Sequence, residues 1–167
     1  MSKVMVIGAG PAGIMAAITA AENHNVVLVD GNEKIAKKLF ITGKGRCNIT
    51  NGKDIGDFFD YIPGNSHFLY SALYSFTNND VIEMIESEGT KLKIERGGRI
   101  FPESDKSSDI IKALSKKLSK AKVDIKLNSK VTDVFFENNT IKSVEINNSQ
   151  KISADYFIIA TGGASYP

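Results

Sequence analysis

The chain has 167 residues, 42% of them hydrophobic, and a formal net charge of +2. This length and apolar content allow one sizeable core and the start of a second unit. The near-neutral charge and the dispersed lysines argue against nucleic acid or an anionic membrane as partner. One cysteine and two histidines exclude an internal disulfide and the usual zinc sites, so no metal is predicted and a reducing cytoplasm is expected.

The first thirty residues have a strand–helix–strand pattern. Residues 4–7 and 26–29 are short, nearly all-apolar runs, as expected of parallel strands buried on both faces. Residues 12–22 have helical character and are rich in alanine, so this helix can lie close to a sheet. Glycines and a proline interrupt the apolar N-terminus, which argues against a signal peptide, and no apolar run is long enough to span a membrane.

Expected helices and irregular segments alternate in the middle of the chain. Helices are expected at residues 33–40, 68–76 and 77–88. Residues 42–52 are too rich in glycine, asparagine and threonine for regular structure. Two short strands flank the dipeptide 97–98, which is a plausible hairpin turn.

The last third of the chain combines a helix with further strands. Residues 107–120 carry isoleucine and leucine on one helical face, so an amphipathic surface helix is expected, followed by a strand at 123–127. Asparagine-rich turns separate three short strands, which predicts an antiparallel meander within residues 131–154. Residues 156–160 form another buried-type strand. Together these elements predict a three-layer, Rossmann-like α/β fold that binds FAD or NAD(P), with a small antiparallel β-meander.

The turn between the first strand and the first helix has the pattern G-x-G-x-x-G. Gly8 permits the tight turn, Gly10 lets a diphosphate approach the backbone, and Gly13 lets the helix pack against the strand. The free amides at the helix start attract phosphates. Asp30 ends the next strand and would accept hydrogen bonds from a ribose. The alternative is a glycine-rich turn in some other α/β fold.

Asp30 also separates the candidate ligands. Its carboxylate would repel the extra phosphate of NADP, so the expected nucleotide is FAD or NAD. Composition alone does not distinguish these two.

A second glycine-rich segment covers residues 42–51. Its glycines expose backbone amides, Lys44 and Arg46 supply cations, and Asn48 and Asn51 supply amides. Such a loop could brace a diphosphate or face a flavin ring. The spacing is not that of an ATPase P-loop, and the alternative is a solvated loop of ordinary turn residues.

Cys47, in the same loop, has two interpretations. Lys44 and Arg46 could increase the acidity of its thiol and make it redox-active. No histidine lies near it in sequence and no second cysteine can resolve it, so a packing cysteine is the preferred interpretation. The dipeptide Gly162-Gly163 after the last strand would let the backbone pass close to a cofactor, or it is a plain strand-ending turn.

Four motifs together resemble the BaiN-type (YhiN-like) family of FAD-dependent oxidoreductases. They lie at residues 6–13, 37–51, 98–104 and 160–167. The resemblance covers essentially the whole chain; the second motif is highly specific, whereas the first is shared by many flavoproteins. Gly31 departs from the family, which usually has a basic residue there.

The resemblance implies a role for each cofactor-binding residue. Residues that hold the diphosphate are Gly8, Gly10, Pro11, Ala12 and Gly13. Asp30 would hold the ribose of ADP, and Val131 would meet the adenine through its backbone. Residues along the flavin side are Gly43, Arg46, Cys47 and Asn48. Residues that pass beside the cofactor are Thr161, Gly162 and Gly163.

The family also implies more protein than this chain contains. Its members continue into a substrate domain and a C-terminal segment that completes the flavin site, so residues 1–167 are expected to be the N-terminal, FAD-binding portion. Alone it should be inactive and could be isolated without FAD. NAD(P)H is a possible electron donor for the whole enzyme; its small-molecule substrate, its catalytic acid or base and its oligomeric state are not predicted.

Three other functions compete with this one. An NAD-dependent dehydrogenase would use the same turn, and a non-catalytic nucleotide-binding module would bind without turnover. An RNA-modifying flavoprotein acting on tRNA is disfavoured by the near-neutral charge.

Overall fold

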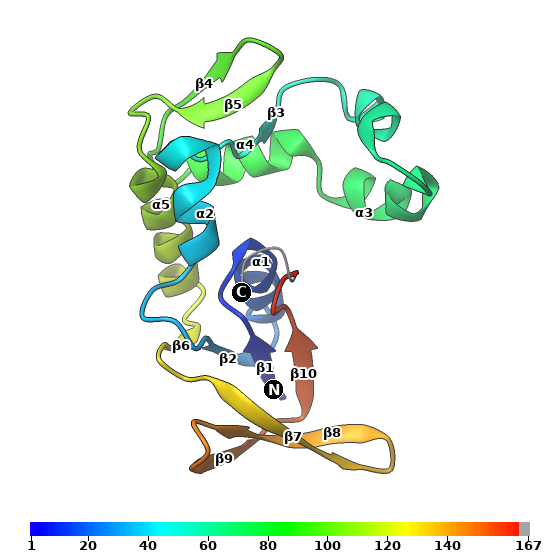
Figure 1. Ribbon diagram of the computed structural model, residues 1–167, viewed down its shortest axis with the longest axis vertical. Coiled ribbons are helices and arrows are strands. Elements are labelled where there is room, and N and C mark those ends of the chain that lie inside the picture. The colour runs from blue at the N-terminus through cyan, green and yellow to red at the C-terminus, as the bar shows by residue number, and fades with distance from the viewer. Residues whose placement is uncertain (164–167) are drawn as a thin grey trace. The chain divides into compact units, whose positions relative to one another are not determined.

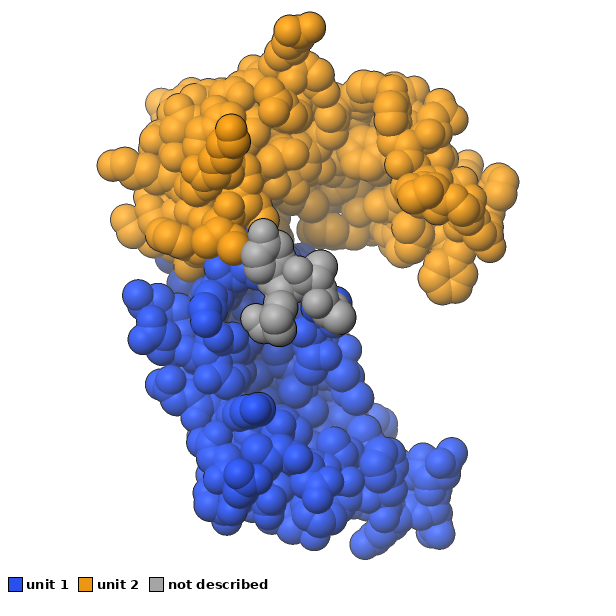
Figure 2. Space-filling view, in the orientation of Figure 1, with its two compact units in different colours: residues 1–39, 114–167 blue, residues 40–113 orange. Residues whose placement is uncertain are grey.

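The computed structural model describes residues 1–163, so the last four residues of the C-terminal family motif lie outside the described residues. The chain divides into two compact units (Figure 2). Unit 1 comprises residues 1–39 and 114–167, and unit 2 comprises residues 40–113. Among the described residues, no helix has the length and apolar character needed to cross a membrane.

Unit 1 contains a four-stranded parallel sheet in the order β10-β1-β2-β6 (Figure 1). Its strands are β1 (Lys3–Ile7), β2 (Asn25–Val29), β6 (Asp124–Lys126) and β10 (Tyr156–Ile159). Ile7 lies opposite both Val29 and Ile159, so the carboxyl ends of the three longer strands meet at one edge. Ligands of parallel α/β sheets bind at this kind of edge.

Two further layers cover the parallel sheet. Helix α1 (Pro11–Ala20) contacts β1, β2 and β10. Its buried residues include Gly13 and Ala17, whose small size allows this close packing. The third layer is an antiparallel sheet of β7 (Val131–Glu137), β8 (Thr140–Ile146) and β9 (Gln150–Ser153).

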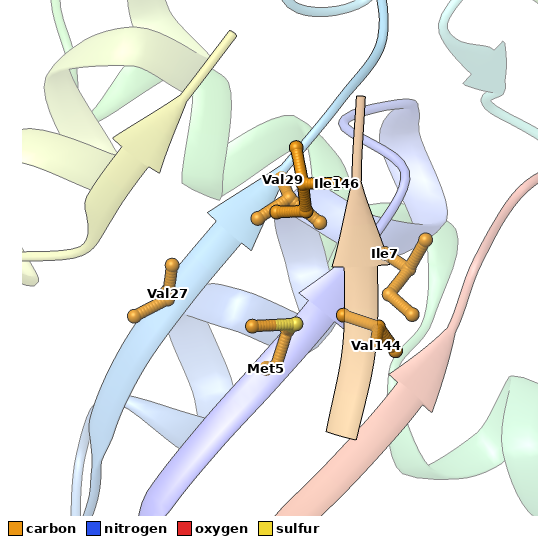
Figure 3. Packing of buried hydrophobic residues seen from close by; sticks show 6 residues of the cluster. All are labelled: Met5, Ile7, Val27, Val29, Val144 and Ile146. Atoms are coloured by element: carbon orange, nitrogen blue, oxygen red, sulfur yellow. The ribbon is translucent and has the colours of Figure 1, made fainter. Parts of the chain in front are cut away.

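The core of unit 1 joins the parallel and antiparallel sheets (Figure 3). Successive side chains of a strand point to opposite faces, so alternate residues of β1 and β2 share the face that packs on β8. The buried members of this cluster are Met5, Ile7, Val27, Val29, Val144 and Ile146. Burying such side chains contributes about 1.5–3 kcal/mol each. The predicted three-layer, Rossmann-like fold with a β-meander is confirmed.

Unit 2 is built on a small antiparallel sheet in the order β3-β5-β4. Its strands are β3 (Thr50–Asn51), β4 (Leu92–Glu95) and β5 (Arg99–Pro102). The α-helices of this part of the chain are α2 (Lys37–Ile41), α3 (Tyr70–Ser75), α4 (Asn78–Glu86) and α5 (Ser107–Lys120), of which α2 begins and α5 ends in unit 1. Short 3-10 helices cover Thr42–Gly45, Ile55–Tyr61 and Ser66–Leu69.

Helix α4 begins with a capping box. The Thr77 hydroxyl accepts from the Asp80 amide, and Asp80 Oδ2 accepts from the Thr77 amide at 2.6 Å. This capping box satisfies two amides that would otherwise lack partners at the helix start. The predicted hairpin around residues 97–98 and the amphipathic helix α5 are confirmed.

Two predicted helices were too long. The helix expected at residues 33–40 begins only at Lys37, because Ala36 adopts a φ of 54° and its amide donates to the Ala9 carbonyl at 2.8 Å. A left-handed residue cannot continue a right-handed helix. The helix expected at 68–76 is a 3-10 turn followed by the short helix α3.

Candidate functional site

Gly8 and Gly13 are required by the packing of unit 1 itself. Gly8 has a φ of +106°, a conformation that L side chains rarely adopt, and an added Cβ would collide with the carbonyl of Ala160. A Cβ on Gly13 would collide with the carbonyl of Gly8. The ends of β1 and β10 and the first turn of α1 therefore approach one another at distances that only glycine permits.

Gly10 has no comparable reason to be glycine. It precedes α1 with a φ of −76° and a ψ of 178°, which any residue can adopt, and an added Cβ would meet no atom within 4 Å. Pro11 follows as the first helical residue, so the first amides of the helix that lack intrahelical partners include those of Ala12 and Gly13. Open space beside free amides suits a phosphate group.

Asp30 directly follows β2 and binds the glycine-rich turn. Its Oδ2 accepts from the Ala9 amide at 2.6 Å, while its Oδ1 accepts from the backbone and side-chain nitrogens of Asn32, both at 2.8 Å. The carboxylate therefore positions the turn in addition to facing solvent. This role was not predicted, although an aspartate followed two residues later by asparagine is a signal for a local side-chain turn.

A cavity of about 210 Å³ opens at the carboxyl edge of the parallel sheet. The residues around it come from the ends of β1 and β2 and the segments that follow them, from the start of β7 and the segment before it, and from the segment after β10. They are Ile7, Gly8, Val29, Asp30, Gly31, Asn32, Ser129, Lys130, Val131 and Thr161. Four predicted cofactor-binding residues, Gly8, Asp30, Val131 and Thr161, thus line one cavity although they lie far apart in sequence.

The dipeptide Gly162-Gly163 follows Thr161 at the same end of β10. Gly162 has a φ of +80°, so its glycine is required by the backbone conformation, and an added Cβ on either residue would meet nothing within 4 Å. Contact of either residue with a cofactor stays a prediction.

The second glycine-rich loop lies in unit 2, where Gly43, Lys44, Gly45 and Cys47 all have positive φ. A Cβ on Gly43 would lie 3.0 Å from the Asn48 amide nitrogen and 3.2 Å from the ring of Phe101. The loop is therefore tightly wound around its own residues, and Gly43 is required by that winding.

Arg46 lies within a cluster of charged side chains in unit 2. Its Nη1 donates to Glu95 Oε1 at 2.8 Å and lies 3.4 Å from Asp105 Oδ1, and its guanidinium lies 4.3 Å from the centre of the Phe101 ring. Lys93 Nζ also donates to Asp105 at 2.6 Å, and this bond holds the pKa of the Asp105 carboxyl below its usual value. Arg46 thus has local partners that account for its position in the loop.

Cys47 is fully buried, and Asn48 braces β5. Burial raises the pKa of the Cys47 thiol, and the hydrogen bond from Thr42 opposes this only in part. A raised pKa disfavours the thiolate, so the packing interpretation of Cys47 is the one that the geometry supports. With its amide nitrogen turned toward the sheet, Asn48 donates to the carbonyls of Ile100 at 3.2 Å and Thr50 at 3.0 Å.

The family assignment rests on a match over nearly the entire chain. Residues 2–167 match the family model described as HI0933-like protein Rossmann domain. The chain belongs to the HI0933-like family. The resemblance to flavin-dependent oxidoreductases of the BaiN type, inferred from the four motifs, is thereby confirmed at the level of the family.

Two relatives of this HI0933-like chain have different names. A 3-dehydro-bile acid delta(4,6)-reductase of Clostridium scindens is 33% identical over 98% of the chain. A ribosomal RNA dihydrouridine synthase of Escherichia coli is 32% identical, also over 98% of the chain. The chain spans 39% and 40% of the lengths of these relatives.

Solved structures place the HI0933-like chain among Rossmann-type folds. A flavocytochrome c3 fumarate reductase in its open conformation gives a TM-score of 0.64 at 24% identity, covering 97% of this chain and 34% of that one. The protein CtdE, solved in complex with FAD, gives 0.57 at 17% identity, covering 97% and 38%. At these identities the likeness shows the fold.

Proposed function

We propose that unit 1 is the FAD-binding part of a flavin-dependent oxidoreductase. The ADP half of FAD occupies the cavity beside Asp30, and its diphosphate lies against the start of α1. The observation that carries this proposal is Gly10, which neither the backbone conformation nor any neighbouring atom requires to be glycine. Close approach of a bound phosphate to the backbone supplies the missing reason.

The remaining assignments extend this proposal along the cofactor. The Val131 backbone meets the adenine, and Thr161, Gly162 and Gly163 pass beside the cofactor. Gly43, Arg46, Cys47 and Asn48 would act through the loop that carries them, along the flavin side. FAD supplies the hydride or electron transfer when bound, and the protein supplies orientation and electrostatics.

FAD is favoured over NAD as the resident nucleotide for two reasons. The four motifs resemble a family of FAD-dependent oxidoreductases and the family model matches residues 2–167, and the same fold binds FAD in CtdE. In this proposal NAD(P)H is the electron donor to the bound flavin and not the resident nucleotide. An NAD-dependent dehydrogenase and a non-catalytic nucleotide-binding module remain the competing functions.

A small molecule is the proposed substrate of the whole, cytoplasmic protein. The near-neutral charge supports this choice. The Escherichia coli relative supplies the second candidate, reduction of a uridine in ribosomal RNA, at almost the same identity. Analysis of dihydrouridine in ribosomal RNA from cells with and without the gene separates the two candidates: loss of one dihydrouridine favours RNA.

The spectrum of the full-length protein tests the proposal. We expect flavin absorption in the visible range, release of FAD on denaturation, and bleaching when NADH or NADPH is added. Asp30→Ala should lose most of the flavin, whereas Asp155→Ala should keep it, because Asp155 accepts from the Lys3 amide at the opposite end of β1. Protein that neither contains FAD nor takes it up when FAD is added in excess would refute the proposal.

A further inference from the structure

Asp30 has little remaining capacity for a ribose. A carboxylate offers about four lone-pair positions, and Asp30 already accepts three hydrogen bonds, from Ala9 N and from both nitrogens of Asn32. About one position remains, on Oδ2. A ribose carries two neighbouring hydroxyls, each a donor and an acceptor. A complete ribose site therefore needs a further polar group beside Asp30.

Three uncharged polar side chains also line the cavity, those of Asn32, Ser129 and Thr161, and the first two are held by neighbours. Asn32 donates to Asp30 and accepts from Lys37 Nζ at 3.0 Å. The Ser129 hydroxyl donates to the Leu127 carbonyl at 3.0 Å. These bonds direct both side chains toward the surrounding loops.

Lys130 is the other charged residue among those lining the cavity, and its backbone is fixed in position by hydrogen bonds. Its backbone nitrogen donates to Asn147 Oδ1 at 3.0 Å, and its carbonyl accepts from the Asn147 amide at 2.8 Å. A Cβ on Gly31 would lie only 3.3 Å from the Cβ of Lys130, so the lysine stem packs against the bare backbone that follows Asp30. Within the described part of the chain, no acidic side chain pairs with its ammonium.

The geometry points to Lys130 as a second ribose-binding residue: its ammonium donates to a hydroxyl of the adenosine ribose while Asp30 accepts from one. This inference rests on the proposed binding of ADP in the same cavity. A carboxylate and an ammonium together match a diol, because the carboxylate accepts hydrogen bonds from the hydroxyl groups and the ammonium donates hydrogen bonds to their oxygens. Asp30 and Lys130 carry opposite charges at the lining of the cavity, so Asp30 alone does not decide whether a 2′-phosphate is repelled.

Titration of FAD into flavin-free full-length protein tests this role. Lys130→Met keeps the length of the side chain and removes the donor, Lys130→Arg keeps the charge, and Lys142→Met is the matched control. Lys142 is exposed on β8 and does not line the cavity. A lost hydrogen bond to a charged group at the lower end of the usual range corresponds to about a tenfold higher Kd. We expect this loss for Lys130→Met, with Lys130→Arg and Lys142→Met within about twofold of the unchanged protein.

FAD analogues that lack the 2′- or the 3′-hydroxyl of the adenosine ribose identify the contact. If the ammonium donates to one of these hydroxyls, the penalty of Lys130→Met disappears for the analogue that lacks it. A penalty that is the same for FAD and both analogues, or no penalty at all, overturns the inference while FAD binding by the unchanged protein upholds the proposed function. Absence of FAD binding by the unchanged protein refutes both.

Discussion

The glycine-rich turn of unit 1 and the glycine-rich loop of unit 2 have similar compositions, but their residues are explained differently. In the turn, Gly8 and Gly13 are required by neighbouring backbone, whereas Gly10 faces open space. In the loop, Gly43, Arg46 and Asn48 all have contacts inside unit 2 that account for them.

This difference shows that a motif can be highly distinctive of a family without its residues being reserved for binding a ligand. The loop is the more distinctive sequence, yet many of its residues are explained by the positive-φ conformation of the loop and by contacts within unit 2. The turn is common among nucleotide-binding proteins, yet it contains Gly10, which no neighbouring atom and no unusual backbone conformation requires to be glycine. Residues with no structural reason are therefore the better guide to a binding site.

The largest expected effect is that of Gly13→Ala. The added Cβ collides with the carbonyl of Gly8, which cannot move without displacing β1 or α1. We expect the free energy of unfolding to fall by about 3 kcal/mol, at the upper end for overpacked sites. Chemical denaturation measures this change. A variant as stable as the unchanged protein would show that the turn adapts easily.

Gly10→Ala should change the stability little and weaken FAD binding strongly. An added Cβ meets no protein atom, so we expect the free energy of unfolding to fall by no more than about 1 kcal/mol, the usual scale of a change at a helix cap. The Kd for FAD should rise about tenfold or more, because the methyl group occupies the space of the diphosphate. Equal FAD affinity in both proteins would remove the main support for the site.

Arg46→Met tests the loop at a smaller scale. Loss of a partly exposed ion pair with Glu95 and of the contact with Phe101 should lower the free energy of unfolding by about 1 kcal/mol. Glu95→Gln removes the same ion pair and keeps the arginine. If Arg46 also lies along the flavin, only Arg46→Met shifts the absorption of bound FAD in the full-length protein. Identical spectra would contradict the flavin-side assignment.

The smallest effect is a pH dependence at the cap of α4. Hydrogen bonds from the Thr77 hydroxyl and amide hold the pKa of Asp80 below its usual value. Its contribution is therefore complete above about pH 4 and is lost as the pH falls through the lowered pKa. Thr77→Ala should lower the free energy of unfolding by about 1 kcal/mol at neutral pH. It should also make the free energy of unfolding fall less steeply with decreasing pH in the acid range, here called the acid limb.

Ser75→Ala is the control for the cap, because Ser75 donates to the Ser71 carbonyl and has no capping carboxylate. It should leave the acid limb unchanged. An acid limb that is equally steep in Thr77→Ala would show that other carboxylates, such as Asp105, dominate it.

The fold of unit 1 could be predicted because each signal was local. Apolar runs marked the buried strands, and the turns of the meander contained Asn138, Asn139, Asn147 and Asn148, all of which adopt positive φ. Asparagine tolerates this conformation better than most residues, so such turns can be recognised from a few neighbouring residues.

The parts that escaped prediction depend on residues far apart in the chain. Nothing near Gly31 indicates that Lys130 packs against it, and nothing near Ala9 indicates that its amide binds Asp30. The shortened helix at Lys37 has the same origin, since the bond between Ala36 and Ala9 sets its start. Local propensity is overridden wherever a tertiary contact fixes the backbone.

Unit 2 interrupts unit 1 between residues 39 and 114, and a hydrogen bond links its first residue to the start of α5. The hydroxyl of Ser107 donates to the carbonyl of Phe40 at 2.9 Å, so residues 40–107 form a closed excursion, after which α5 carries the chain on into unit 1. For a closed excursion of this kind, each doubling of length costs only about 0.6 kcal/mol in closure entropy. Changes in length between α2 and α5 should therefore cost the parallel sheet little, and the nucleotide-binding half can be kept while its accessory half diversifies.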